Sequence, residues 1–351
     1  MKRAEVTFKF LTPALLAGAD QKSAEMRASS IRGALRWWMN ALGYDKDCIN
    51  DLFGTAAGET GRRSRVIVRD TTDENLSRMI KERQTADMIL NQNKPKNKPD
   101  YFLWPLGKPE NARGVIQAGS TASFSVFLRS GESEDLEKGL KAFLLLGSLG
   151  SRSRRCYGSI WPVSVTIDNK PWRIPKSTAE MKQVLESVFD QYANMEIDSI
   201  GDRSLRDWKF AVETCSNFLK SYRCGSPKSG EPSAWGENDH DAPFPFNKKD
   251  CVYRPVLGLP LTQRYSSGKT VTSQIKGYDR LASPVHFKII SLDGGFLPIV
   301  FFCYNMMIPD GTEVKLDGMS KTLQLKGSEL IEEIRNDKSL KVLGDFIDYG
   351  D

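Results

Sequence analysis

The chain has 351 residues, of which 40% are apolar and 27% are charged, a balance typical of one large globular domain or two ordinary ones. Its 50 basic and 44 acidic residues leave a formal charge of only +6, which alone indicates no class of partner. Six cysteines without C-x-x-C spacing and only two histidines, His240 and His286, argue against a zinc knuckle, and we expect no metal and no cofactor.

The N-terminus predicts a strand and not a secretory signal. Val6, Phe8 and Phe10 alternate with polar residues, and Lys9 and Pro13 interrupt the apolar run. No stretch approaches the roughly 20 apolar residues of a transmembrane helix, so we expect no membrane contact. Unpaired, reduced thiols are typical of a cytoplasmic location.

The first half predicts elements in the order β-α-β-β-α-β, which is the ferredoxin-like arrangement. Ile31, Leu35 and Trp38 fall on one face of a helix, and Ser133 is placed to cap another. This gives an N-terminal domain at 1–167 with a polar insertion at 71–114. The expected elements are strands at about 5–11, 64–70, 121–129 and 157–167, and helices at about 29–42, 47–53 and 133–147.

The second half predicts a helical segment and flexible loop at 168–250, and then a degenerate ferredoxin-like unit at 251–351. The amphipathic pattern of 178–222 favours helix, and the Gly, Pro and Ser content of 223–250 favours a loop. The expected later elements are strands near 252–259, 284–291 and 296–305, a helix near 327–336 and an apolar segment near 340–348. The predicted fold class is therefore α+β, with two ferredoxin-like (RRM-like) units and helical and loop insertions; such sheets frame many RNA-binding modules, although the topology hosts other functions too.

A glycine-, serine- and arginine-rich loop follows the predicted helix that ends near Gly147. Glycines let a phosphate approach the main-chain N–H groups, and arginines add charge and forked hydrogen bonds. A tight turn with solvated arginines is the alternative. We predict a sequence-independent phosphate site here, formed by Gly147, Gly150, Ser151, Arg152, Ser153, Arg154 and Arg155.

A second candidate segment is the helix start at 29–38. Free N–H groups at a helix start attract anions, so Arg32 is a candidate phosphate ligand, although a solvated helix flank remains the alternative. The other candidate RNA-binding residues are Gly33, Arg36, Arg62, Arg63, Arg264, Lys269 and Arg280.

Four segments carry a resemblance to a known family. Ser30 to Trp38, followed by Leu52-Phe53-Gly54, resembles the opening of RAMP-superfamily proteins, and 150–159 looks like their glycine-rich loop, although Cys156-Tyr157 departs from the usual pair. The segments 254–260 and 280–288 resemble C-terminal motifs of one family within it, the first subunits of the type III-B (Cmr) CRISPR effector complex. The resemblance touches about 1–70, 140–165 and 250–290.

The resemblance implies two ferredoxin-like units and a non-catalytic, RNA-binding role in antiviral defence. It implies that the chain holds the 3′ region of the guide (CRISPR) RNA at one end of a Cmr complex. The implied partners are guide RNA, target RNA and the other subunits of that complex.

Three other functions are weighed against this one. An RNA-cleaving RAMP relative needs a general base and acid, for which His240, His286, Asp87, Asp100 and Asp239 are the candidates. A P-loop is disfavoured, because Ser-Gly-Lys-Thr at 267–270 is preceded by Gln263 where the motif needs glycine. A protein-interaction subunit without RNA contact would leave the glycine-rich loop unexplained.

Overall fold

The computed structural model describes residues 1–20, 23–56, 61–74, 101–103, 114–189, 194–225, 231–244, 247–259, 261–264, 270–275, 277–278, 280–317, 319 and 321–346. Most of the polar insertion expected at 71–114 lies outside these residues. Within the described part of the chain, no helix is both long enough and apolar enough to cross a membrane.

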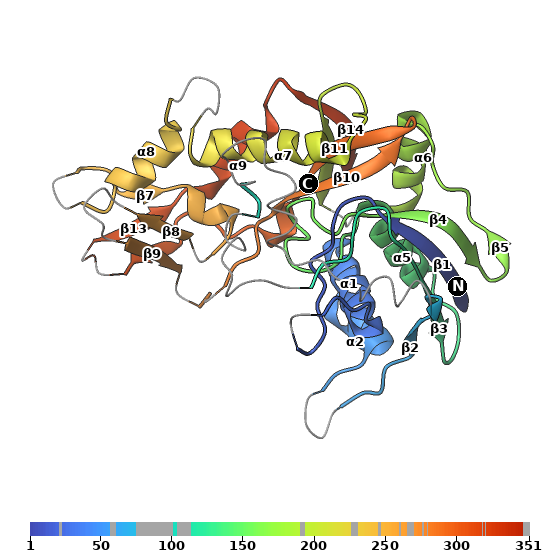
Figure 1. Ribbon diagram of the computed structural model, residues 1–351. Coiled ribbons are helices and arrows are strands. Elements are labelled where there is room, and N and C mark those ends of the chain that lie inside the picture. The colour runs from blue at the N-terminus through green and yellow to red at the C-terminus, as the bar shows by residue number, and fades with distance from the viewer. Residues whose placement is uncertain are drawn as a thin grey trace.

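The first half folds as the sequence predicts, into an antiparallel sheet of order β2-β3-β1-β4-β5 (Figure 1). Its first four strands have the ferredoxin-like order, with α1 and α5 as the two connecting helices. Ile31, Leu35 and Trp38 on α1 are buried, and the Ser133 hydroxyl accepts a hydrogen bond from the N–H of Leu136 to cap α5. The elements are β1 (Arg3–Phe10), α1 (Ala28–Ala41), α2 (Lys46–Phe53), β2 (Val66–Asp70), β3 (Thr121–Leu128), α5 (Glu134–Leu146), β4 (Ile160–Ile167) and β5 (Lys170–Pro171).

The second half contains a second ferredoxin-like unit, with an antiparallel sheet of order β10-β11-β6-β14. In chain order its elements again read β-α-β-β-α-β, which repeats the strand arrangement of the first unit. Helix α7 packs on β10 and β11. The elements are β6 (Met195–Ile200), α7 (Trp208–Arg223), β10 (Val285–Leu292), β11 (Gly295–Cys303), α9 (Gly327–Arg335) and β14 (Leu340–Phe346), and α6 (Thr178–Val188) joins the two units.

A third, smaller sheet is inserted into the second unit and lies at the left of Figure 1, beside α8. Its strand order is β7-β13-β12-β9-β8, and only the β7–β13 pair is parallel. The elements are α8 (Ala234–Asp241), β7 (Cys251–Val252), β8 (Leu261–Arg264), β9 (Thr270–Ile275), β12 (Glu313–Leu316) and β13 (Thr322–Leu325), with short 3₁₀ helices η4 (Arg254–Leu257) and η5 (Tyr304–Met306).

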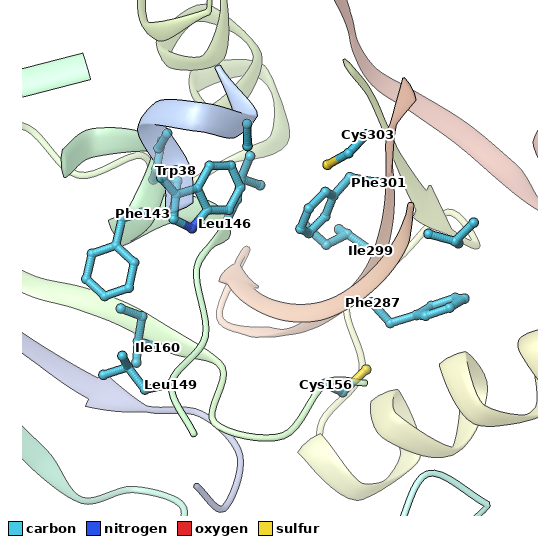
Figure 2. Packing of buried hydrophobic residues seen from close by; sticks show 14 of the residues in the cluster. Trp38, Phe143, Leu146, Leu149, Cys156, Ile160, Phe287, Ile299, Phe301 and Cys303 are labelled. Carbon is cyan, nitrogen blue, oxygen red and sulfur yellow. The ribbon is translucent and has the colours of Figure 1, made fainter. Parts of the chain in front are cut away.

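One apolar core runs through both ferredoxin-like units. Figure 2 shows Trp38 of α1 facing Phe301 of β11, and their ring centroids are 5.8 Å apart. Lys288 of β10 is fully buried and donates a 2.7 Å hydrogen bond to the Leu145 carbonyl at the end of α5. Burial lowers the pKa of Lys288 well below its ordinary value. These contacts fix the second sheet against the helices of the first unit.

The structure differs from the expected helical segment at 178–222. Helix α6 ends at Val188, and Met195–Ile200 forms β6, which is paired on both sides by β11 and β14. A short apolar run is compatible with either a buried strand or a helix. Its pairing with strands distant in the sequence determines that it forms a strand. The second sheet therefore also draws on 195–200, a range outside the 251–351 expected for this unit.

Two further predictions are corrected in the inserted region. The stretch 223–250, expected as a loop, contains α8, whose N–H of Gly236 donates to the Ser233 hydroxyl. The strand expected at 252–259 ends at Val252, and the 3₁₀ helix η4 follows with Pro255 in its first turn. Proline has no N–H to donate to a sheet and its fixed φ suits a first helical turn.

Candidate nucleic-acid interface

The glycine-rich loop between α5 and β4 is held by both ferredoxin-like units. The N–H of Ser151 donates to the Leu15 carbonyl at 2.9 Å, and the N–H of Cys156 donates to the Phe287 carbonyl of β10 at 3.0 Å. Gly150 has φ +92°, and a Cβ there would lie 2.6 Å from the Leu15 carbonyl oxygen. Glycine is therefore required by both the backbone conformation and the close approach of the neighbouring chain.

The three arginines of the loop do not share one environment. Arg152 has φ +63° and Cys156 has φ +66°, and these left-handed residues turn the chain on either side of Arg154 and Arg155. Arg154 is exposed and Arg152 is half-buried, whereas Arg155 is only 9% exposed. Two adjacent loop arginines therefore point into different surroundings.

Arg155 is buried and ties backbone carbonyls together between the two units. Its guanidinium donates to the carbonyls of Arg154 at 3.0 Å and Val285 at 2.9 Å, and it lies 5.6 Å from the Phe287 ring centroid. Burial, followed by repulsion from Arg223, lowers its pKa to about 9. Its donors are used on backbone carbonyls, so the structure gives no support to the prediction that Arg155 contacts phosphate, which stays untested.

Arg152 lies near Arg223 at the end of α7, and Arg152, Arg154 and Arg223 all lie close enough to Arg155 to repel its charge. Partial burial, followed by repulsion from Arg223, lowers the pKa of Arg152. Across the described ranges, no ion pair joins any of these three guanidinium groups to a carboxylate. We name Arg152, Arg154 and Arg223 the loop-arginine surface. Sequence reasoning missed Arg223, because a basic residue in a last helical turn is ordinarily explained by the helix dipole.

The arginines of α1 point toward α2 and not toward the loop. Arg32 donates to the Phe53 carbonyl and lies 5.8 Å from the Phe53 ring centroid. Arg36 donates to the Gly54 carbonyl at 3.1 Å and to Asn50 Oδ1 at 2.9 Å. Both satisfy groups at the C-terminal end of α2. The structure therefore does not place Arg32 or Arg36 in one cluster with the loop arginines.

The remaining predicted site residues are spread over the molecule. Gly33 is exposed with open space beside it, and Gly147 ends α5 by donating to the Phe143 carbonyl. Arg62 and Arg63 are exposed beside Gly54, and Arg280 is exposed before β10. The backbone of Arg264 is in β8, whereas Lys269 lies outside the described residues.

Comparison with known proteins finds a family similarity for the first unit. Residues 7–161 match the model of the RAMP superfamily. The first unit is therefore similar to RAMP-superfamily domains. Its glycine-rich loop and α1 are the elements that carry the resemblance in the sequence.

Two curated proteins that are similar to this chain are from Pyrococcus furiosus. The CRISPR system Cmr subunit Cmr1-2 is 28% identical over 173 residues, which cover 43% of this chain and 89% of that protein. Cmr subunit Cmr1-1 is 33% identical over 159 residues, which cover 42% of this chain and 43% of that protein, less than half its length. The crystal structure of Cmr1 from Pyrococcus furiosus in its apo form has a TM-score of 0.59 at 17% identity and covers 99% of this chain and 100% of that chain. This similarity shows a shared fold across both ferredoxin-like units.

A cavity of about 250 Å³ lies where the first ferredoxin-like unit meets the second. Ser30, Ala34 and Trp37 line it from one face of α1, the face roughly opposite to Arg32 and Arg36. The rest of the wall comes from the loop, including Ser148 and Arg154, and from His286 and Phe301 of β10 and β11. The cavity thus lies beside the loop-arginine surface, which shares Arg154 with it.

The candidate catalytic residues do not form a general acid and base pair among the described residues. The Asp239 carboxylate is buried and accepts from the N–H groups of Tyr253 and Arg254 and from the Arg254 side chain, so it organises the turn after β7. His240 is half-buried on α8, whereas His286 is buried in β10. Asp87 and Asp100 lie outside the described residues. The described residues also contain no group of three or more His, Cys, Asp or Glu side chains placed to hold a metal ion.

Proposed function

We propose that this chain is a non-catalytic, RNA-binding subunit of a type III-B (Cmr) CRISPR effector complex. In this role it holds the 3′ region of the guide RNA and contacts the target RNA and neighbouring subunits in antiviral defence. The match to the RAMP superfamily and the two Cmr relatives support the assignment. The observation that carries it is the loop-arginine surface, where Arg152, Arg154 and Arg223 surround Arg155 and no ion pair to a carboxylate is found for them among the described residues.

The physical reason is charge compensation. Gathering like charges in a partly desolvated place is unfavourable unless an anion neutralises them. Phosphates of single-stranded RNA supply regularly spaced negative charge, and arginine pairs with them through two parallel hydrogen bonds. Because such contacts read no base edge, the surface should bind the backbone of RNA of any sequence.

Isolation of the protein from its native cells tests the assignment. A tagged copy should copurify with short CRISPR-derived RNAs and with other subunits of the Cmr complex. The RNAs are identified by RNA sequencing and the subunits by peptide sequencing. The Arg152→Gln, Arg154→Gln, Arg223→Gln variant should recover less RNA at equal protein yield. Recovery of subunits without any RNA would contradict RNA binding by this surface and leave only an assembly role.

The non-catalytic part of the proposal has its own assay. The purified protein should leave end-labelled single-stranded RNA intact for hours, with and without divalent metal. Cleavage that disappears in His240→Ala or Asp239→Asn, while the melting temperature is unchanged, would instead support a ribonuclease.

A further inference from the structure

Two residues that line the cavity between the first and second units, Ser148 and His286, carry buried polar atoms without partners among the described residues. Ser148 Oγ and His286 Nε2 are both buried, and neither has a hydrogen-bond partner among the described residues. Buried polar atoms are normally satisfied, because each unpaired group retains the cost of its lost hydration. Two such atoms on residues of one cavity wall leave unused hydrogen-bonding capacity beside the place where a ligand would lie.

The chemistry of His286 defines what that ligand must offer. Burial, followed by repulsion from Arg154 and Arg155, lowers its pKa well below the ordinary value, so the ring is neutral. A hydrogen bond between the His286 ring and the backbone of Ser283 acts to raise the pKa of the ring. A bond with this effect is one that the ring N–H donates. A neutral imidazole has one N–H, so Nε2 is left as an acceptor. The ligand must therefore present a donor to His286.

The shape of the cavity favours a small planar group. Trp37 stacks on His286 with ring centroids 5.2 Å apart and an interplanar angle of 27°. Trp38 and Phe301 complete an aromatic wall. The volume of about 250 Å³ is below the roughly 300 Å³ at which sites for drug-sized ligands begin. Aromatic side chains beside single-stranded RNA are the usual platforms for unstacked bases.

We propose that this cavity receives one unstacked nucleobase of the RNA whose phosphates lie on the loop-arginine surface. Arg154 belongs to both places, so a phosphate and its base can be held at once. His286 Nε2 accepts a hydrogen bond from the base, and the Ser148 hydroxyl forms a second one. Each of the four bases carries an amino or ring N–H donor on its pairing edge, so the site detects a base without selecting which one. This inference rests on the proposed RNA binding.

The test compares two ribonucleotide decamers, one of adenosine and one with an abasic ribose at every position. Wild-type protein should bind the adenosine decamer about tenfold more tightly, the effect expected of one stacked and hydrogen-bonded base. The variant His286→Phe, Ser148→Ala keeps an aromatic ring but removes the acceptor and the hydroxyl. It should lose most of this preference while its dependence on salt stays that of wild type.

Arg152→Gln is the complementary variant, because it should weaken binding of both decamers by the same factor. If the double variant melts earlier than wild type, Ser148→Ala alone should still reduce the preference several-fold. A wild-type protein that binds neither decamer would refute the RNA-binding function and this inference with it. A wild-type protein that binds both equally, or a folded double variant with an unchanged preference, would refute the base cavity alone and indicate that only water occupies it.

Discussion

Neutralising the loop-arginine surface should change how RNA binding depends on salt. The perturbation is Arg152→Gln, Arg154→Gln and Arg223→Gln, which removes three charges without adding repulsion. Each phosphate contact of a single strand contributes about −0.7 to the slope of log affinity against log salt. Three contacts contribute about −2.1, so a fourfold rise in salt should weaken wild-type binding by about 18-fold through these contacts.

The assay is fluorescence anisotropy of a labelled decamer, titrated at several salt concentrations between about 50 and 200 mM. The matched control is Arg3→Gln, Arg129→Gln and Arg173→Gln, which removes the same charge from exposed arginines outside the loop. The loop variant should lose about two units of slope, whereas the control should keep the wild-type slope. Equal slopes for the loop variant and wild type, with both proteins folded, would refute phosphate binding at this surface.

Three further predictions concern stability. Gly150→Ala should lower the free energy of unfolding by about 2–4 kcal/mol in a denaturant titration, because φ is positive and the new Cβ meets the Leu15 carbonyl; an unchanged midpoint would contradict this. Arg155→Leu should lower the free energy of unfolding by about 2–3 kcal/mol, since buried carbonyls lose their donor. The dependence of RNA binding on salt should stay that of wild type, and a reduced slope would show that Arg155 contacts phosphate. Burial, followed by the negative charge of Glu196, raises the pKa of Asp198 to about 7, so its protonated form favours the fold and that contribution is lost as pH rises from about 4 to 7. Asp198→Asn should therefore raise the melting temperature more at pH 8 than at pH 4, and an equal shift at both would show that Asp198 does not titrate in this range.

The sequence was most informative where one local signal sufficed. The apolar stripe of α1 and the Ser133 cap of α5 predict their helices, since spacing and capping act within a few residues. The strand pattern of β6 was missed, because its six residues pair with β11 and β14, which lie roughly 100 and 145 residues later in the chain.

The candidate site also has features that the sequence predicted and features that only the tertiary structure shows. The sequence by itself determined that glycines and arginines gather in one loop after α5, because that is local composition. Only the tertiary structure decided that Arg155 turns inward to the carbonyls of the second unit while Arg152 and Arg154 remain available. It also brought Arg223 to the loop and His286 to Trp37. These are contacts between distant segments, and they exist only because one apolar core joins the two ferredoxin-like units.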